Sequence, residues 1–377
     1  MMGPIPYGRQ SIDDEDVAAV VEALRSDWLT TGPRVAEFEA AIATTAGVSD
    51  AITTSNGTAA LHVAYAAAGV GPIDEVVVPA LTFVATAAAA AQLGATIVFA
   101  DVEEDTGNID PRAAAALVND ATRVVAAVDY AGHPSDADAL KTLTSASGAL
   151  LLEDAAHSIA STYRGRPVGS LADITTFSFF PTKNMTTAEG GAVVTDDPAL
   201  AEAARRFRNH GLVRDRALQR RPEEGPWHQE VHSLGLNYRL PDVLCALGLS
   251  QLRRIVEFKT ARARVFDRYM DGLADVEGLT LPARRPDTDP MWHLFPIRVQ
   301  GGRRREVFDF LRANGVLVQV NYIPVYWHPY FEDLGYRRGM CPVAERYYAE
   351  EISLPMYASL GESDQLRVID LVRRALE

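Results

Sequence analysis

The sequence predicts an α/β protein with a mainly parallel, doubly wound sheet and a smaller α+β domain near its C-terminal end. Between residues 51 and 195, apolar runs of strand length alternate with helical segments, a pattern typical of parallel sheets covered by helices. After residue 250, a long helical segment leads through a proline-rich turn into isolated apolar runs. The 377 residues suffice for two domains, which we predict at residues 1–250 and 251–377.

The first predicted elements are a helix, a loop and a strand that leads into a second helix. Ser11 and Asp14 form a capping-box pattern, and apolar residues at helical spacing from Val17 to Leu24 follow it. Residues 26–33 read as a loop. Residues 51–54 predict a strand, and residues 59–68 predict the helix after it.

The remaining elements follow from the same patterns. Further strands are predicted at residues 76–78, 96–100, 124–128, 150–152, 174–180 and 192–195. Residues 198–209 are helical, residues 215–230 form a long polar loop, and one long helix spans about residues 242–269. In the small domain, apolar runs at residues 292–299 and 316–320 flank a helix at residues 305–314.

Composition excludes several classes of function. A formal net charge of −14 argues against nucleic acid or an anionic membrane as a partner. The two cysteines, Cys245 and Cys341, form neither a disulfide framework nor a metal-ligand spacing, which suits a reducing compartment. The N-terminus lacks a secretory signal pattern and no apolar run is long enough to span a membrane, so we expect a cytoplasmic protein without a metal.

Two charged residues follow predicted strands. Asp154 follows the run 150–152 and Lys183 follows the run 174–180, so both are expected at the carboxyl edge of the sheet, where α/β folds bind ligands. A buried lysine can form a Schiff base with pyridoxal phosphate (PLP), and an acid can keep the cofactor's ring nitrogen protonated. Taken alone, however, Lys183 equally fits a solvated surface residue and Asp154 a helix cap.

The strand–turn–helix segment at residues 51–68 predicts an anion site. Gly57 and Thr58 stand at the start of a helix, where free backbone N–H groups and the helix dipole favour a phosphate. A plain N-cap by Asn56 or Thr58 is the alternative. Neither a P-loop nor a dinucleotide-binding fingerprint occurs in the sequence.

The combination of Glu153-Asp154-Ala155-Ala156-His157, Phe177-Ser178-Phe179, Lys183 and Glu189-Gly190-Gly191 resembles the signature of the DegT/DnrJ/StrS family of PLP-dependent sugar aminotransferases. The resemblance covers nearly the whole chain. It implies the aspartate aminotransferase-like fold type I and a homodimer with shared active sites. It also implies that Lys183 carries PLP and that the cofactor contacts the following residues: Gly57, Thr58, Phe83, Asp154, His157, Ser178 and, from the neighbouring subunit, Asn237.

The resemblance also suggests a reaction. His157 replaces the glutamine of most members, which resembles the branch that makes UDP-4-amino-4,6-dideoxy-N-acetyl-β-L-altrosamine. It implies an amino donor, expected to be L-glutamate, and a nucleotide-linked 4-keto-6-deoxy sugar as acceptor. The implied substrate contacts are Tyr7, Asp27, Trp28, Leu29, Thr30 and His328.

Residue types alone leave other interpretations open for several of these positions. Tyr7 and the loop after it fit an ordinary helix entry and turn, Phe83 fits a core residue, and Asn237 fits a turn before a helix. Three alternatives exist for the whole protein. The same family includes enzymes for other dTDP- or UDP-ketosugars or for carbocyclic ketones of antibiotic biosynthesis. It includes dehydratases, which carry histidine where Lys183 stands here. A non-catalytic binding or regulatory protein is the third.

Overall fold

The computed structural model describes residues 3–377 and contains a central seven-stranded sheet of order β1-β9-β8-β5-β4-β2-β3. Neighbouring strands from β3 to β8 are parallel, whereas β9 runs antiparallel to both β8 and β1. The strands are β1 (Asp50–Thr54), β2 (Glu75–Pro79), β3 (Thr96–Ala100), β4 (Thr122–Val128), β5 (Leu150–Asp154), β8 (Ile174–Ser178) and β9 (Gly191–Thr195). The predicted α/β fold with a mainly parallel sheet is therefore confirmed.

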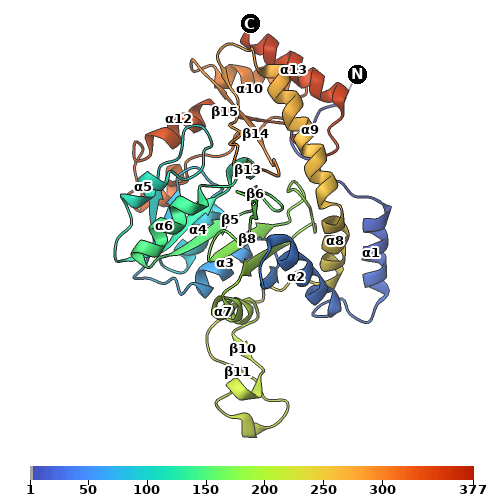
Figure 1. Ribbon diagram of the computed structural model, residues 1–377, viewed down its shortest axis with the longest axis vertical. Helices are drawn as coiled ribbons and strands as arrows, with labels where there is room; N and C mark the ends of the chain where they lie inside the picture. Colours follow the sequence, from blue (N-terminus) through green and yellow to red (C-terminus); the bar gives the residue numbers. More distant parts are fainter. Residues whose placement is uncertain (1–2) are drawn as a thin grey trace.

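Helices cover both faces of this sheet because both faces of its strands are apolar. In β2, for example, Val76 and Val78 face one core cluster and Val77 faces another. One face packs on α3 (Gly57–Ala67), α4 (Ala85–Gln92) and α7 (Pro198–Arg208). The other face packs on α2 (Pro33–Ala46), α5 (Pro111–Ala115), α6 (Ala137–Ser147) and α8 (Asp242–Arg253), as Figure 1 shows.

A second, smaller layer lies at the end of the molecule that carries both termini (Figure 1). It contains the antiparallel sheet β12-β14-β15 and the helices packed on it. These elements are α9 (Ile255–Leu273), β12 (Leu279–Thr280), β14 (Phe295–Val299), α10 (Arg304–Ala313), α12 (Pro342–Glu350), β15 (Glu351–Leu354) and α13 (Glu362–Leu376). The predicted domain boundary at residue 250 falls inside α8 and stays a prediction.

Three sequence-based predictions of local structure were wrong. The run 316–320 makes only isolated bridges, in which Val316 pairs with Ile5 and Gln319 with Ser353. The single helix expected at residues 242–269 is two helices, because the chain breaks at Arg254 between α8 and α9. The capping box of α1 (Asp14–Arg25) uses Asp13 and Asp16 rather than Ser11 and Asp14, because the chain turns into the helix two residues later.

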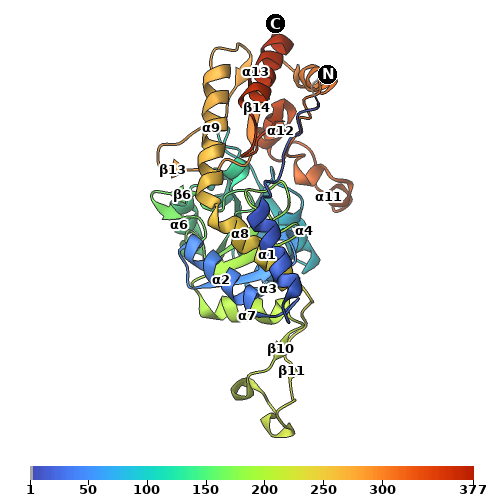
Figure 2. The same ribbon diagram turned by 90° about the vertical axis from the view of Figure 1, so that its right-hand side faces the viewer.

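The first helix, α1, buries Asp16 and Ala23 against the protein and leaves most of its larger apolar side chains exposed. Asp16 is buried, pairs with Arg254 and accepts a hydrogen bond from Gln251 Nε2 at 2.6 Å. The apolar stripe of α1 therefore faces outward, and Val17 is 53 % and Leu24 56 % exposed. Figures 1 and 2 show α1 as an outer helix that covers α8.

The polar segment predicted as a long loop is a two-stranded arm. β10 (Leu212–Val213) pairs with β11 (Glu230–Val231), and the turns between them project away from the body in both views (Figures 1 and 2). The carboxylate of Glu230 holds the tip together, because it accepts hydrogen bonds from the backbone of Arg220 and Arg221 and from His232. Among the helices within residues 3–377, none is both long and apolar enough to cross a membrane.

Candidate active site

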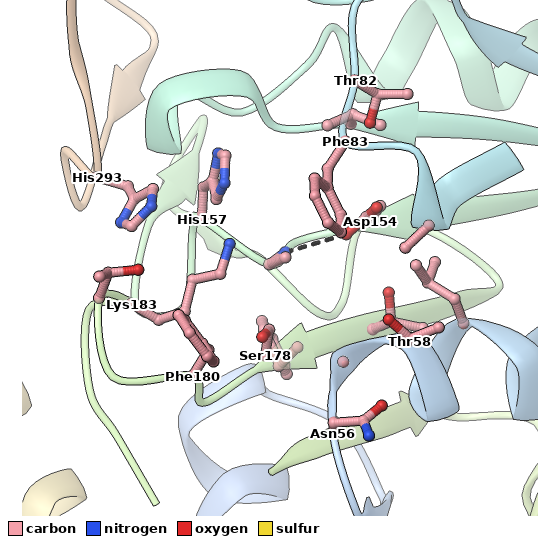
Figure 3. A pocket seen from close by; sticks show the side chains of 18 of the residues that line it. Asn56, Thr58, Thr82, Phe83, Asp154, His157, Ser178, Phe180, Lys183 and His293 are labelled. Carbon is pink, nitrogen blue, oxygen red and sulfur yellow. Dashed lines mark hydrogen bonds between the residues drawn. The ribbon is translucent and has the colours of Figure 1, made fainter. Parts of the chain in front are cut away.

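A cavity of about 450 Å³ lies at the carboxyl ends of β1, β2, β4, β5 and β8. The position is the one expected of an open α/β sheet, where the loops after parallel strands meet. Residues from the second layer close the far side of the cavity. The residues most relevant to its chemistry are Tyr7, Gly57, Thr58, Phe83, Asp154, His157, Ser178, Lys183, Glu189, His293, Asn321 and Tyr322. Figure 3 labels Thr58, Phe83, Asp154, His157, Ser178, Lys183 and His293 among them.

Asp154 and Lys183 line the same cavity and act on each other electrostatically. Burial lowers the pKa of Lys183 to about 8, and the carboxylate of Asp154 opposes this change. Burial raises the pKa of Asp154, while a hydrogen bond from Thr86 Oγ1 at 2.6 Å and the nearby Lys183 counteract it. The site therefore keeps an amine with a large neutral fraction beside a carboxylate held in place by Thr86.

The start of α3 approaches the end of β8 closely because residue 57 is glycine. A Cβ atom at Gly57 would lie only 2.8 Å from the side chain of Ser178, so a larger residue would push the two elements apart. Asn56 caps the helix by accepting a hydrogen bond from the backbone N–H of Ala59 at 2.8 Å. The Ser178 hydroxyl and the first N–H groups of α3 thus share one corner of the cavity, as an anion site requires.

His157 lies between two other rings. Its Nε2 is 3.2 Å from the hydroxyl of Tyr322, and its ring centroid is 4.2 Å from that of His293. Burial and the charge of Lys183 lower the pKa of His157 well below its ordinary value. His157 sits in a turn rather than on a helix after β5, and within residues 3–377 its buried Nδ1 has no hydrogen-bond partner.

Sequence reasoning missed Thr86, Asn184, His293, Asn321 and Tyr322. Each lies at or next to the cavity through tertiary packing. Asn321 and Tyr322 belong to the segment 321–328, which resembles a substrate-side loop of the family, but only His328 of that segment was predicted to contact substrate. Of the other three, only the position of Thr86, one helical turn after Thr82, carries a weak local signal: the two hydroxyls are 2.9 Å apart.

The predicted substrate contacts fall into two groups. Tyr7 lines the cavity, and its hydroxyl accepts a hydrogen bond from Asn321 Nδ2 at 2.7 Å. Asp27, Trp28, Leu29, Thr30 and His328 are not among the residues that line the cavity of their own chain. Asn237 is exposed and pairs with Asn209 at the base of the arm, so it too lies outside this chain's cavity.

The residues present fit PLP. The cofactor needs an amine for its aldehyde, an acid for its ring nitrogen and donors for its phosphate. Lys183, Asp154 and the corner formed by Gly57, Thr58 and Ser178 supply these three groups within one cavity. Phe83 lies at the rim and is 56 % exposed, so its ring is free to contact a bound ligand.

Comparisons with known proteins agree with this geometry. The chain is 38 % identical to the spore coat polysaccharide biosynthesis protein SpsC of Bacillus subtilis, over 98 % of this chain and 96 % of SpsC. Its structure matches PseC of Helicobacter pylori, an aminotransferase involved in the biosynthesis of pseudoaminic acid, with a TM-score of 0.92. That match has 31 % identity and covers 99 % of both chains.

A third similar protein is the putative sugar aminotransferase Spr1654 of Streptococcus pneumoniae, solved in its PLP form. It matches with a TM-score of 0.92 and 28 % identity, over 99 % of this chain and 98 % of Spr1654. The model of the DegT/DnrJ/EryC1/StrS aminotransferase family matches residues 10–373, nearly the whole chain. The chain therefore belongs to the DegT/DnrJ/EryC1/StrS family and is a PLP-dependent sugar aminotransferase of fold type I.

Proposed function

We propose that this enzyme transfers the amino group of L-glutamate to a UDP-linked 4-keto-6-deoxy sugar and forms UDP-4-amino-4,6-dideoxy-N-acetyl-β-L-altrosamine. The observation that carries this proposal is the position of His157, which lines the cavity together with Lys183 and is the residue on which the resemblance to this branch of the family rests. The likeness to PseC, named for the biosynthesis of pseudoaminic acid, supports the same acceptor.

Lys183 is the proposed acid–base catalyst. PLP, when bound, supplies an electron sink that makes a proton on the donor's α-carbon removable. With a pKa of about 8, the Lys183 amine is neutral often enough to accept that proton at Nζ and then to return it. Because the amine is tethered within the cavity, the transfer is effectively intramolecular.

The other cofactor contacts are assigned by position. Asp154 is proposed to keep the ring nitrogen protonated, and His157 to contact the ring's 3-oxygen. Gly57, Thr58 and Ser178 are proposed to bind the phosphate through backbone N–H groups and a hydroxyl. Phe83 is proposed to stack on the ring, and Tyr7 to contact the substrate.

We propose further that the active unit is a homodimer. Asn237, the residue expected at the phosphate, is exposed and outside its own cavity, so the phosphate it is proposed to contact is that of another subunit. Large apolar side chains are also exposed on α1, on the loop after it and on the arm, as at a surface covered by a second copy. They are Val17, Leu24, Trp28, Leu29, Trp227 and Leu234. In that case, only the dimer can bring residues 27–30 and His328 into contact with substrate.

A second acceptor class fits the same chain. The cofactor side of the cavity is built on strand ends, whereas the acceptor side is built on loops and on the second layer, which vary more easily. The likeness to SpsC, a spore coat polysaccharide biosynthesis protein, favours another nucleotide-linked ketosugar. A cytoplasmic location, expected from the sequence, stays a prediction.

The test is a direct acceptor comparison. Purified enzyme, PLP and L-glutamate would be incubated with UDP- and dTDP-linked 4-keto-6-deoxy sugars. For each sugar, kcat/KM would be measured, and the product would be identified by its mass and stereochemistry. We expect the UDP-linked N-acetylated ketosugar to give the highest value and an amine at C4. A higher value with a dTDP-linked sugar would refute the proposed acceptor and leave the aminotransferase assignment intact. L-Aspartate and L-alanine in place of glutamate test the donor in the same assay.

A further inference from the structure

His293 reaches the cavity from a segment that the proposed mechanism does not use. It lies between β13 (Thr288–Asp289) and β14, and its backbone N–H donates to the carbonyl of Ala131 at 2.7 Å. Its ring packs on that of His157 at a centroid distance of 4.2 Å and an interplanar angle of 32°. In Figure 3, His293, His157 and Lys183 gather at the same end of the cavity.

Asn184 determines which nitrogen of His293 carries the proton. Asn184 directly follows Lys183 and is buried. One end of its amide lies 2.8 Å from the carbonyl oxygen of His157, and because a carbonyl only accepts, that end must be the NH₂ group. The other end is therefore the oxygen, which lies 3.0 Å from His293 Nδ1. Nδ1 must donate, and Nε2 of the neutral ring is then an acceptor.

The surroundings of His293 keep it neutral. The titratable and charged groups that act on it are His157, Lys183 and Arg262. Burial lowers the pKa of His293 well below its ordinary value, and all three neighbours lower it further. Arg262 is fully buried and donates to three backbone carbonyls, one of which belongs to Lys183 at 3.4 Å. A proton on His293 would therefore face cations without a counter-charge.

We infer that His293 is a positioning residue, which restrains the ring of His157 by packing against it and holds the segment after Lys183 through its hydrogen bond to Asn184. Tyr322 contacts the Nε2 end of His157, so the ring is restrained from both sides. A catalytic group must be held by neighbours whose own orientation is restrained. The inference rests on the roles proposed for Lys183 and His157.

The first test uses the apo-protein and no substrate. Nitrogen-15 NMR of histidine side chains distinguishes the two neutral tautomers, and the signals of His293 are those lost in His293→Asn. We expect the form protonated on Nδ1, unchanged between about pH 5 and pH 8, where an ordinary histidine titrates. An Nε2-protonated form, or titration in that range, would overturn the inference. Neither result depends on the sugar acceptor or on turnover, so the proposed reaction is tested separately.

The second test measures the affinity for PLP and the visible circular dichroism of the bound cofactor. His293→Phe keeps a ring but removes the donor, His293→Asn keeps a donor near Nδ1, and Asn184→Ala removes the acceptor. We expect His293→Phe to weaken PLP binding by about tenfold and to change the dichroism, as loss of a buried hydrogen bond implies. His293→Asn should recover affinity to within about threefold. Asn184→Ala should weaken PLP binding at least as much as His293→Phe, because it also removes the donor to the carbonyl oxygen of His157.

The double variant and a matched control decide the outcome. If His293 acts through its bond to Asn184, the double variant His293→Phe/Asn184→Ala should bind PLP no more weakly than Asn184→Ala alone. The inference would be overturned if the losses of PLP affinity in the two single variants multiply in the double variant. It would also be overturned if His293→Phe keeps native PLP affinity and dichroism. His133→Phe alters another buried histidine, which packs on Trp292 outside the cavity. His133→Phe should change thermal stability without changing the dichroism of bound PLP. If it changed the dichroism as much as His293→Phe does, the effect would be a general one of core disruption. If His293→Phe does not fold, the inference is tested by the PLP affinity of Asn184→Ala and by the tautomer of His293 in the NMR experiment.

Discussion

The cavity at the strand ends and the surface formed by α1 and the arm differ in how their side chains are partnered. In the cavity, polar groups lie inside the protein and each restrains another: Thr86 donates to Asp154, whose charge acts on Lys183. On α1 and the arm, apolar groups lie outside, and Trp227 near the tip is 79 % exposed. The first region is built from residues of one chain, to which the proposed dimer adds Asn237 of the second subunit. The second has the composition of a surface that meets another protein.

This difference separates two kinds of function. Chemistry that needs fixed distances belongs on the rigid strand ends, where both neighbours of each residue are held by the sheet. Contacts that need a second copy belong on elements that project, as the arm does in Figure 2. Changes in the cavity should therefore act within one subunit, and changes on α1 or the arm should act between subunits.

The largest effect is expected from removing the amine of the cavity. Lys183→Ala should lower turnover by roughly 10⁵-fold or more, because a tethered catalytic group is lost. The sequence contains only three lysines, and the other two pair with carboxylates: Lys141 with Asp173 and Lys259 with Asp289. Borohydride reduction of the PLP-loaded protein should place the cofactor mass on the Lys183 peptide alone. Cofactor mass on either other lysine would show that the site is misassigned.

The next effect comes from the acid. Asp154→Asn keeps the size and polarity of the side chain but removes the charge proposed to hold the ring proton, so PLP should bind while the half-reaction with glutamate slows by roughly 10²-fold or more. Stopped-flow absorbance without any sugar measures this step. A near-native rate would reduce Asp154 to a structural residue bonded to Thr86.

The pH dependence of cofactor loading tests the electrostatic link between the two residues. Only the neutral amine attacks the PLP aldehyde, so the loading rate of the apo-protein should rise about tenfold per pH unit and level off near pH 8, the pKa of Lys183. Asp154 raises that pKa, so in Asp154→Asn the plateau should begin at lower pH. A plateau that moves upward, or not at all, would contradict a direct interaction across the cavity.

Mixed dimers test whether the exposed region serves a neighbouring site. Lys183→Ala and Asn237→Asp subunits are each expected to be nearly inactive, the latter because a carboxylate would face a phosphate. If Asn237 acts across the interface, one site of each mixed dimer has both native residues. Random exchange should then restore activity to about a quarter of native, half the dimers having one good site each. No recovery, with exchange confirmed by native mass spectrometry, would place Asn237 outside the site.

The smallest effect on folding is expected on α1. Val17→Asp puts a charge into the outward apolar stripe and should raise the dimer dissociation constant while changing the free energy of unfolding of the separated chain by only about 0.5 kcal/mol or less. Leu366→Asp makes the same kind of change at a similarly exposed position on α13 and is the control. Analytical ultracentrifugation measures both variants. Equal behaviour of the two would argue that α1 faces solvent.

Much of the cofactor side of the cavity could be predicted from sequence. Asp154 and Ser178 end strands, Gly57 begins a helix and Lys183 lies in the loop that follows β8, and parallel strands bring such positions to one edge. By contrast, His293 reaches the cavity from the second layer, far along the chain, and nothing in its local sequence indicates this. The burial of Asp16 on α1 could not be predicted for a similar reason, because its partners Gln251 and Arg254 are more than two hundred residues away.

By itself, the sequence determined the alternation of strands and helices, the parallel sheet and the family, because apolar periodicity and contiguous motifs are local properties of a chain. Only the tertiary structure decided the rest. It packed His293 against His157, buried Asp16 of α1 against Arg254 and Gln251, and left Asn237 outside its own cavity. These are contacts between residues distant in sequence, and their free energy depends on which groups end up buried together, which no local pattern encodes.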